Sequence, residues 1–161
     1  MLLESPEYLN HLKWMNRAWE LAEAAGLAGE VPVGAVIINA DGKLIAEGEN
    51  RKERDQDPTA HAEIIAIRAA AKIQQTWRLH ECTLYITLEP CPMCAGAIVH
   101  SRMSSVVYGV DDPKTGAIRT VINIPDSPAS NHHLKVIGGI LESACRKQLQ
   151  NWFATRRREK I

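Results

Sequence analysis

The chain has 161 residues, 45% hydrophobic and 24% charged, with a formal net charge of zero. This length fits a single domain over 1–161 with one continuous core. Four cysteines do not make the disulfide framework of a secreted domain, and no run of about 18 apolar residues predicts a membrane span. Acidic Glu4 and Glu7 stand where a signal peptide would be basic, so we expect a cytoplasmic protein with no membrane partner.

Apolar residues recur at helical spacing in some segments and form short continuous runs, typical of buried strands, in others. Turn residues over 39–42 join two of the strands, and a polar loop without periodicity follows over 50–58. In chain order we expect a helix over 5–25, strands over 33–38 and 43–49, a helix over 60–73, a strand over 82–88, a helix over 91–101, strands over 104–110 and 134–140, and a terminal helix from 142.

Capping residues and glycines predict the ends of two helices. Ser5 is a suitable cap for the first helix, and Gly26 and Gly29 are expected to end it. Asp57 or Thr59 is expected to cap the helix that begins near residue 60. The order of elements predicts an α/β protein in which one mixed sheet has helices on both faces.

Histidine and cysteine occur at metal-ligand spacing in two segments. His61 lies two residues before Glu63, and Cys91 lies three residues before Cys94. One imidazole and two thiolates are zinc ligands. Three protein ligands leave a fourth position for water, as in catalytic zinc sites, whereas structural sites usually have four protein ligands. The pattern therefore favours a catalytic metal site.

The expected helices bring these two segments together. Each segment opens a helix, so two positive helix ends meet at the metal and favour deprotonated thiolates. Glu63 is not needed as a ligand and is suited to carry a proton. A carboxylate that merely interacts with the helix dipole is the simpler alternative. Cys82 and Cys145 have no partner at such spacing, and we interpret them as buried thiols.

Positive charge gathers at the C-terminal end. Residues 142–161 contain six Lys and Arg against two Glu. Two interpretations stay open. The cations either complement the dipole at a solvated helix end or contact a polyanion.

Two motifs resemble the signature of the cytidine-deaminase-like zinc deaminases. His61-Ala62-Glu63 and Pro90-Cys91-Pro92-Met93-Cys94 match H-x-E followed by P-C-x-x-C. Further blocks are similar to the bacterial tRNA-specific adenosine deaminases within that superfamily. These blocks are Val31–Val36, Asn50-Arg51, Asp57–Glu63, Met93–Arg102 and Lys114–Ala117. The two ends of the chain match in pattern only.

This resemblance implies a fold and a reaction. The fold would be a three-layer α/β/α sandwich around a central mixed five-stranded sheet. The reaction would be hydrolytic deamination of adenosine to inosine at the wobble position of a tRNA anticodon. A zinc-activated water would be the nucleophile, and Glu63 would shuttle the proton.

The resemblance also implies site residues and partners. Glu63 would be catalytic, one Zn²⁺ per subunit would bind His61, Cys91 and Cys94, and the substrate would contact Asn50, Ala62 and Pro90. For Asn50, a role in stabilising a turn is the alternative. The partners would be a tRNA anticodon stem-loop near Arg156–Arg158 and a second copy of the chain at the helix over 93–102. No DNA partner is expected.

Two other functions remain open. A deaminase of a free base or nucleotide, of guanine or cytosine type, would share the Pro-Cys-Pro-Met-Cys motif and suit the zero net charge. A catalytically silent RNA-binding or dimer-partner subunit is the second alternative. A complete ligand set beside Glu63 argues against that alternative.

Overall fold

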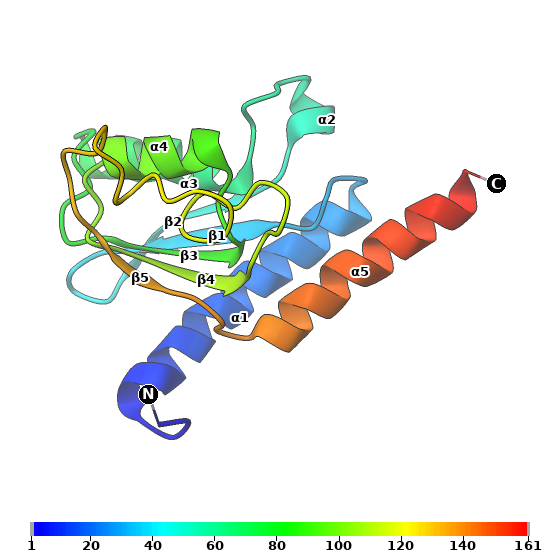
Figure 1. The fold of residues 1–161 in the computed structure, drawn as a ribbon, viewed down its shortest axis with the longest axis horizontal. Helices are drawn as coiled ribbons and strands as arrows, with labels where there is room; N and C mark the ends of the chain where they lie inside the picture. Colours follow the sequence, from blue (N-terminus) through cyan, green and yellow to red (C-terminus); the bar gives the residue numbers. More distant parts are fainter. Residues whose placement is uncertain (1, 161) are drawn as a thin grey trace.

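The computed structural model describes residues 2–160, which form three layers (Figure 1). A five-stranded sheet separates α3 and α4 on one face from α1 and α5 on the other. The three-layer α/β/α fold expected from the sequence is confirmed. The helices are α1 (Pro6–Leu27), α2 (Lys52–Asp55), α3 (Ala62–Gln74), α4 (Pro92–His100) and α5 (Glu142–Glu159); the strands are β1 (Gly34–Ile38), β2 (Leu44–Glu49), β3 (Thr83–Leu88), β4 (Ser105–Val110) and β5 (Lys135–Ile137).

The sheet is mixed, with the strand order β2-β1-β3-β4-β5. β1 pairs antiparallel with both β2 and β3, whereas β3, β4 and β5 run parallel to one another. All five residues of β1 are buried, because helices cover this strand on both faces. Within residues 2–160, no helix is both long and apolar enough to cross a membrane.

The first helix begins as expected and ends later than expected. The Ser5 hydroxyl accepts a hydrogen bond from the Tyr8 N–H at 3.2 Å, which confirms Ser5 as the cap. Gly26 does not end the helix, which continues to Leu27, whereas Gly29 follows the C-cap residue Ala28 with a φ of 90°. A Cβ atom at Gly26 would lie 3.3 Å from the Trp152 ring of α5, so this glycine allows close packing between the two helices.

The loop over 50–58 contains an element that its sequence does not indicate. Residues Lys52–Asp55 form the short helix α2. The buried Glu30 carboxylate accepts hydrogen bonds from the N–H groups of Glu53 and Arg54, both at 3.0 Å, and from the Arg54 side chain at 3.1 Å. A side chain distant in the sequence therefore stabilises the start of this helix.

The expected caps of α3 are wrong. The Asp57 carboxylate accepts hydrogen bonds from the N–H and the hydroxyl of Thr59, at 2.8 and 2.7 Å, and so closes a turn inside the loop. The helix begins two residues later than expected, at Ala62, with His61 in the N-cap position.

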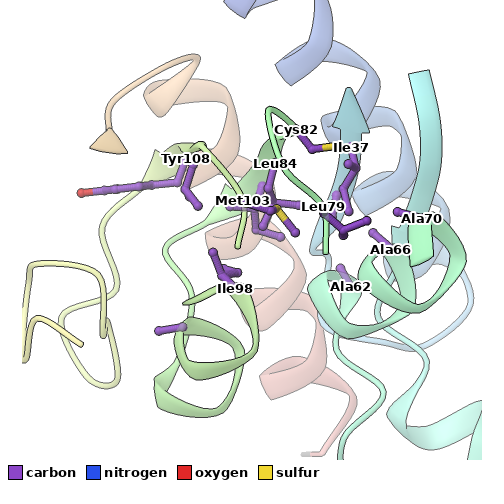
Figure 2. Packing of buried hydrophobic residues seen from close by; sticks show 14 of the residues in the cluster. Ile37, Ala62, Ala66, Ala70, Leu79, Cys82, Leu84, Ile98, Met103 and Tyr108 are labelled. Carbon is purple, nitrogen blue, oxygen red and sulfur yellow. The ribbon is translucent and has the colours of Figure 1, made fainter. Parts of the chain in front are cut away.

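Small residues allow α3 to lie close to the sheet. A Cβ atom at Gly48 of β2 would be 2.2 Å from the Ala62 carbonyl oxygen and 2.8 Å from the Ala66 nitrogen. Figure 2 shows Ala62, Ala66 and Ala70 along one side of α3, within the buried cluster. This close approach fixes the position of the first turn of α3 above the sheet.

We predict an acid-sensitive contribution to stability from Glu30. Burial opposes ionisation of this carboxylate, but its hydrogen bonds from Glu53 and Arg54 outweigh burial and lower the pKa of Glu30. A lowered folded-state pKa gives stability that is present above the unfolded pKa, about 4.3, and is lost as pH falls through the folded value. The change Glu30→Gln should therefore cost about 1 to 3 kcal/mol at pH 7 and less at low pH.

Urea unfolding between pH 7 and pH 2.5 measures this effect. The matched control is Glu20→Gln, which removes an exposed ion pair with Arg17 and should change stability little. If Glu30→Gln lowered the free energy of unfolding by the same amount at every pH, the prediction would be contradicted.

Candidate metal centre

Three potential ligands from two segments meet at one point. The Nδ1 atom of His61 lies 3.6 Å from Cys91 Sγ and 3.5 Å from Cys94 Sγ. All three ligand atoms lie within 4.8 Å of one another, and within residues 2–160 no fourth histidine, cysteine or carboxylate joins this group. An imidazole, two sulfur atoms and an open fourth position fit a catalytic zinc ion.

The local backbone explains this convergence. His61 is the N-cap residue of α3, and Cys91 is the N-cap residue of α4, each in extended conformation. Pro92 then occupies the first turn of α4, where its missing N–H costs no helical hydrogen bond. The two helices lie on the same face of the sheet, so both positive helix ends point at the site.

The two cysteines behave as a pair. Hydrogen bonding from Cys94, supported by His61, lowers the pKa of Cys91 to about 4 despite partial burial. The same pairing raises the pKa of Cys94, and burial raises it further. A divalent cation binds cysteine as the thiolate, so metal binding would favour the deprotonated form of both residues.

Glu63 lies in the first turn of α3, next to the three ligands in the fold. Its side chain is 4% exposed. Burial raises the pKa of Glu63 to about 7, although the positive charge of His61 opposes this shift. A carboxyl group with such a pKa can take up or release a proton near neutral pH.

The three residues expected to contact substrate are brought to the same region, but their polar groups are largely occupied. The amide of Asn50, which is 9% exposed, donates to the Val31 carbonyl at 2.9 Å and accepts from the Ala62 N–H at 3.0 Å. Ala62 and Pro90 are buried, and the Pro90 carbonyl accepts from the Ala117 N–H at 2.8 Å. Asn50 therefore fixes the start of α3, whatever else it contacts.

Sequence reasoning missed Glu89, which immediately precedes Pro90. This carboxylate is 2% exposed and accepts hydrogen bonds from the backbone N–H groups of Asp112, Ile118, Arg119 and Thr120 at 3.0 to 3.2 Å. The Thr120 hydroxyl also donates to it. Burial opposes ionisation, but these donors outweigh burial and lower the pKa of Glu89. The only signal in the sequence was a charged residue between a buried strand and Pro90-Cys91.

A groove of about 620 Å³ lies between the segment 111–115 and α5. Val31, whose carbonyl holds Asn50, and Leu88, which precedes Glu89, also line it. Its lining includes the basic residues Lys114, Arg146 and Arg157 and the acidic residues Asp111 and Asp112. Of the basic tail residues, Arg157 lines this groove, whereas Arg156 lines a second cavity between α1 and α5.

The chain matches a family model and a curated relative over most of its length. The model of MafB19-like deaminases matches residues 9–155. The tRNA-specific adenosine deaminase of Haemophilus influenzae is 49% identical over 148 residues, which cover 92% of this chain and 86% of the relative.

Solved structures agree with this match. A structure from a study of A-to-I editing by tRNA:A34 deaminases has a TM-score of 0.83 and 41% identity, over 85% of this chain and 99% of that one. A guanine deaminase from Nitrosomonas europaea has a TM-score of 0.77 and 27% identity, over 96% of this chain and 87% of that one. The chain therefore belongs to the MafB19-like deaminases, within the group of the tRNA-specific adenosine deaminases.

Proposed function

We propose that this enzyme converts adenosine to inosine at the wobble position of a tRNA anticodon. The observation that carries this function is the buried Glu63 beside a group of three zinc ligands, His61, Cys91 and Cys94. The relatives named above support the substrate, because the adenosine deaminases of tRNA are more similar in sequence than the guanine deaminase. Free cysteines at the site support a proposed cytoplasmic location. The single five-stranded sheet supports a proposed single domain over 1–161.

Each group in the site has a chemical task. A zinc ion held by His61, Cys91 and Cys94 would lower the pKa of water to about 7 and so supply a nucleophile at neutral pH. Glu63 would accept one proton of the water and deliver it to the ring nitrogen beside the reacting carbon. The second proton of the water would pass to the amino group, so that the C–N bond breaks and ammonia leaves. Burial raises the pKa of Glu63 above that of an ordinary carboxyl group, which favours its uptake of a proton.

Three residues are proposed to hold the nucleotide. Asn50 has one amide hydrogen beyond its bond to Val31, and this hydrogen is available to a ligand. The Pro90 carbonyl has a second lone pair beside the one that Ala117 uses. Ala62, fully buried behind Asn50, shapes the wall of the site.

The RNA backbone is proposed to follow the groove between α5 and segment 111–115. Lys114 and Arg157 line this groove and have no acidic partner within residues 2–160. Phosphates can therefore bind these cations without displacing an ion pair. A wobble base in a loop is already partly unstacked, so its extrusion costs little.

We predict that the change Glu63→Gln abolishes turnover and retains the metal. Removing a general acid and base typically costs at least about 100-fold in rate. Zinc-loaded protein is incubated with an anticodon stem-loop that carries adenosine at the wobble position, and inosine is measured by mass spectrometry of the digested nucleosides. Free guanine and cytosine are assayed in parallel for ammonia release. Ammonia from a free base, with no inosine from the stem-loop, would show that the free base is the substrate. Inosine formation by Glu63→Gln at the wild-type rate would contradict the proposed role of Glu63.

We predict one zinc ion per chain, held by the three ligands. Purified wild-type protein should contain one zinc by elemental analysis, and Cys94→Ser should lose most of it because the site then lacks a thiolate. The matched control is Cys82→Ala, which also removes a buried thiol and should leave the zinc content unchanged. If both single variants, His61→Ala and Cys94→Ser, kept a full zinc content, this ligand set would be contradicted.

We propose a homodimer that meets at α4. The outer face of this helix carries Met93, Gly96, Ala97 and His100, which stand at positions i, i+3, i+4 and i+7 and so lie on one side of the helix. Met93 is 37% exposed, and a Cβ atom at Gly96 would meet no other atom within 4 Å. An exposed helix face with small residues at its centre allows a second helix to approach closely.

Light scattering after gel filtration tests the dimer. Wild-type protein should have a mass near twice 17.9 kDa. Gly96→Lys should shift the mass toward one chain, because a long charged side chain separates the two helices. The control Ala40→Lys, at an exposed position of the turn between β1 and β2, should keep the wild-type mass. A monomeric wild-type protein would contradict the proposal.

A further inference from the structure

We propose that Glu89 is a positioning residue for RNA binding: its buried carboxylate holds the segment 111–120 in the conformation that presents Lys114 to the RNA backbone. This inference rests on the proposed function, since it assigns a residue to the RNA groove described above. Glu89 does not itself line the groove and so acts through the segment that it binds.

The segment 111–120 contains no helix or strand, and its internal backbone hydrogen bond, from the Gly116 N–H to the Asp112 carbonyl at 3.0 Å, closes only one turn. The two oxygen atoms of Glu89 join its two ends. Oε1 accepts from Asp112 at the start of the segment, and Oε2 accepts from Ile118, Arg119 and Thr120 at its end. The carboxylate thus closes the segment into a loop by joining its two ends.

The glycine at the centre of this loop fits around the carboxylate. A Cβ atom at Gly116 would lie 2.6 Å from both Cδ and Oε1 of Glu89 and 2.5 Å from the Asp112 carbonyl oxygen. A side chain at this position would displace either the carboxylate or the loop. Gly116 and Glu89 therefore form one packing unit.

A short chain of hydrogen bonds connects Glu89 to Lys114. The Asp112 N–H donates to Glu89, and the Asp112 carboxylate accepts from the N–H groups of Lys114 and Thr115 at 2.9 and 3.2 Å. Thr115 also donates its hydroxyl to Asp112 at 2.8 Å. The turn that carries Lys114 is therefore fixed relative to Glu89.

The same loop is attached to the segment that carries the metal ligands. The Ala117 N–H donates to the Pro90 carbonyl at 2.8 Å, and the Glu89 N–H donates to the Val110 carbonyl at 2.9 Å. These two hydrogen bonds connect the segment 111–120 rigidly to the segment that carries Cys91. Glu89 sets the distance between the phosphate contact at Lys114 and the site where the base reacts.

The test compares the salt dependence of RNA binding among variants. The probe is a fluorescent anticodon stem-loop with adenosine at the wobble position, bound to zinc-loaded protein at several sodium chloride concentrations. Loss of one phosphate contact lowers the slope of log Kd against log salt by about one. We expect this change, with Kd about tenfold weaker, in both Glu89→Gln and Lys114→Ala.

The double variant separates positioning from general loss of structure. If Glu89 acts through Lys114, Glu89→Gln combined with Lys114→Ala should lower the slope no further than either single change. Gly116→Ala leaves the carboxylate intact but displaces the loop, and should lower the slope equally. If Glu89→Gln does not fold, the slope of Gly116→Ala alone tests whether the loop positions Lys114. Zinc content should remain at one per chain in each variant.

The matched control is Tyr85→Phe, which removes a buried hydrogen bond of 2.8 Å to His11 on the α1 face of the sheet. It should lower thermal stability and leave the salt slope unchanged. A wild-type slope in both Glu89→Gln and Gly116→Ala, or additive slopes in the double variant, would overturn the proposal. A wild-type protein that binds the hairpin but forms no inosine would overturn the proposed function alone, whereas one that does not bind it would overturn both.

Discussion

The site depends on one constraint: α3 and α4 must begin at the same point above the sheet. The ligand atoms of His61, Cys91 and Cys94 come within 4.8 Å only because each helix starts directly after its first ligand. Gly48 allows α3 to lie against β2 at backbone distance, and Asn50 binds the first N–H of α3. The position of a metal ligand is thus defined by backbone contacts that involve no metal.

Three buried carboxylates differ in their environments. Glu30 and Glu89 each accept several hydrogen bonds from backbone N–H groups, and these donors lower their pKa values despite burial. Glu63 has fewer donors, so burial dominates and raises its pKa to about 7. The number of donors therefore separates two structural anions, which stay charged, from one group that can exchange a proton.

The sequence predicted the layers and the ligand group because both leave regular local patterns. Apolar runs identify the strands, and the pairs His61 with Glu63 and Cys91 with Cys94 have the spacing of a known signature. The missed features depend on contacts between distant segments. Glu30 stabilises α2 from 23 residues away, and Glu89 binds Thr120 from 31 residues away.

The caps of α3 were mispredicted for a related reason. Asp57 and His61 are both compatible with the start of a helix, and only the structure shows that Asp57 binds Thr59. Local patterns define which element forms, whereas long-range hydrogen bonds define where it begins.

The way in which Glu89 holds its loop has a consequence for variation of this enzyme. The carboxylate binds mainly backbone N–H groups, which every residue except proline possesses, so the loop does not depend on the identity of most of its side chains. Lys114, whose side chain makes none of these bonds, can be exchanged while the backbone around Glu89 is retained. Glu89 and Gly116, by contrast, constrain each other, because a side chain at position 116 would collide with the carboxylate. Substrate preference can therefore diverge at the groove while the architecture of the reaction site stays constant.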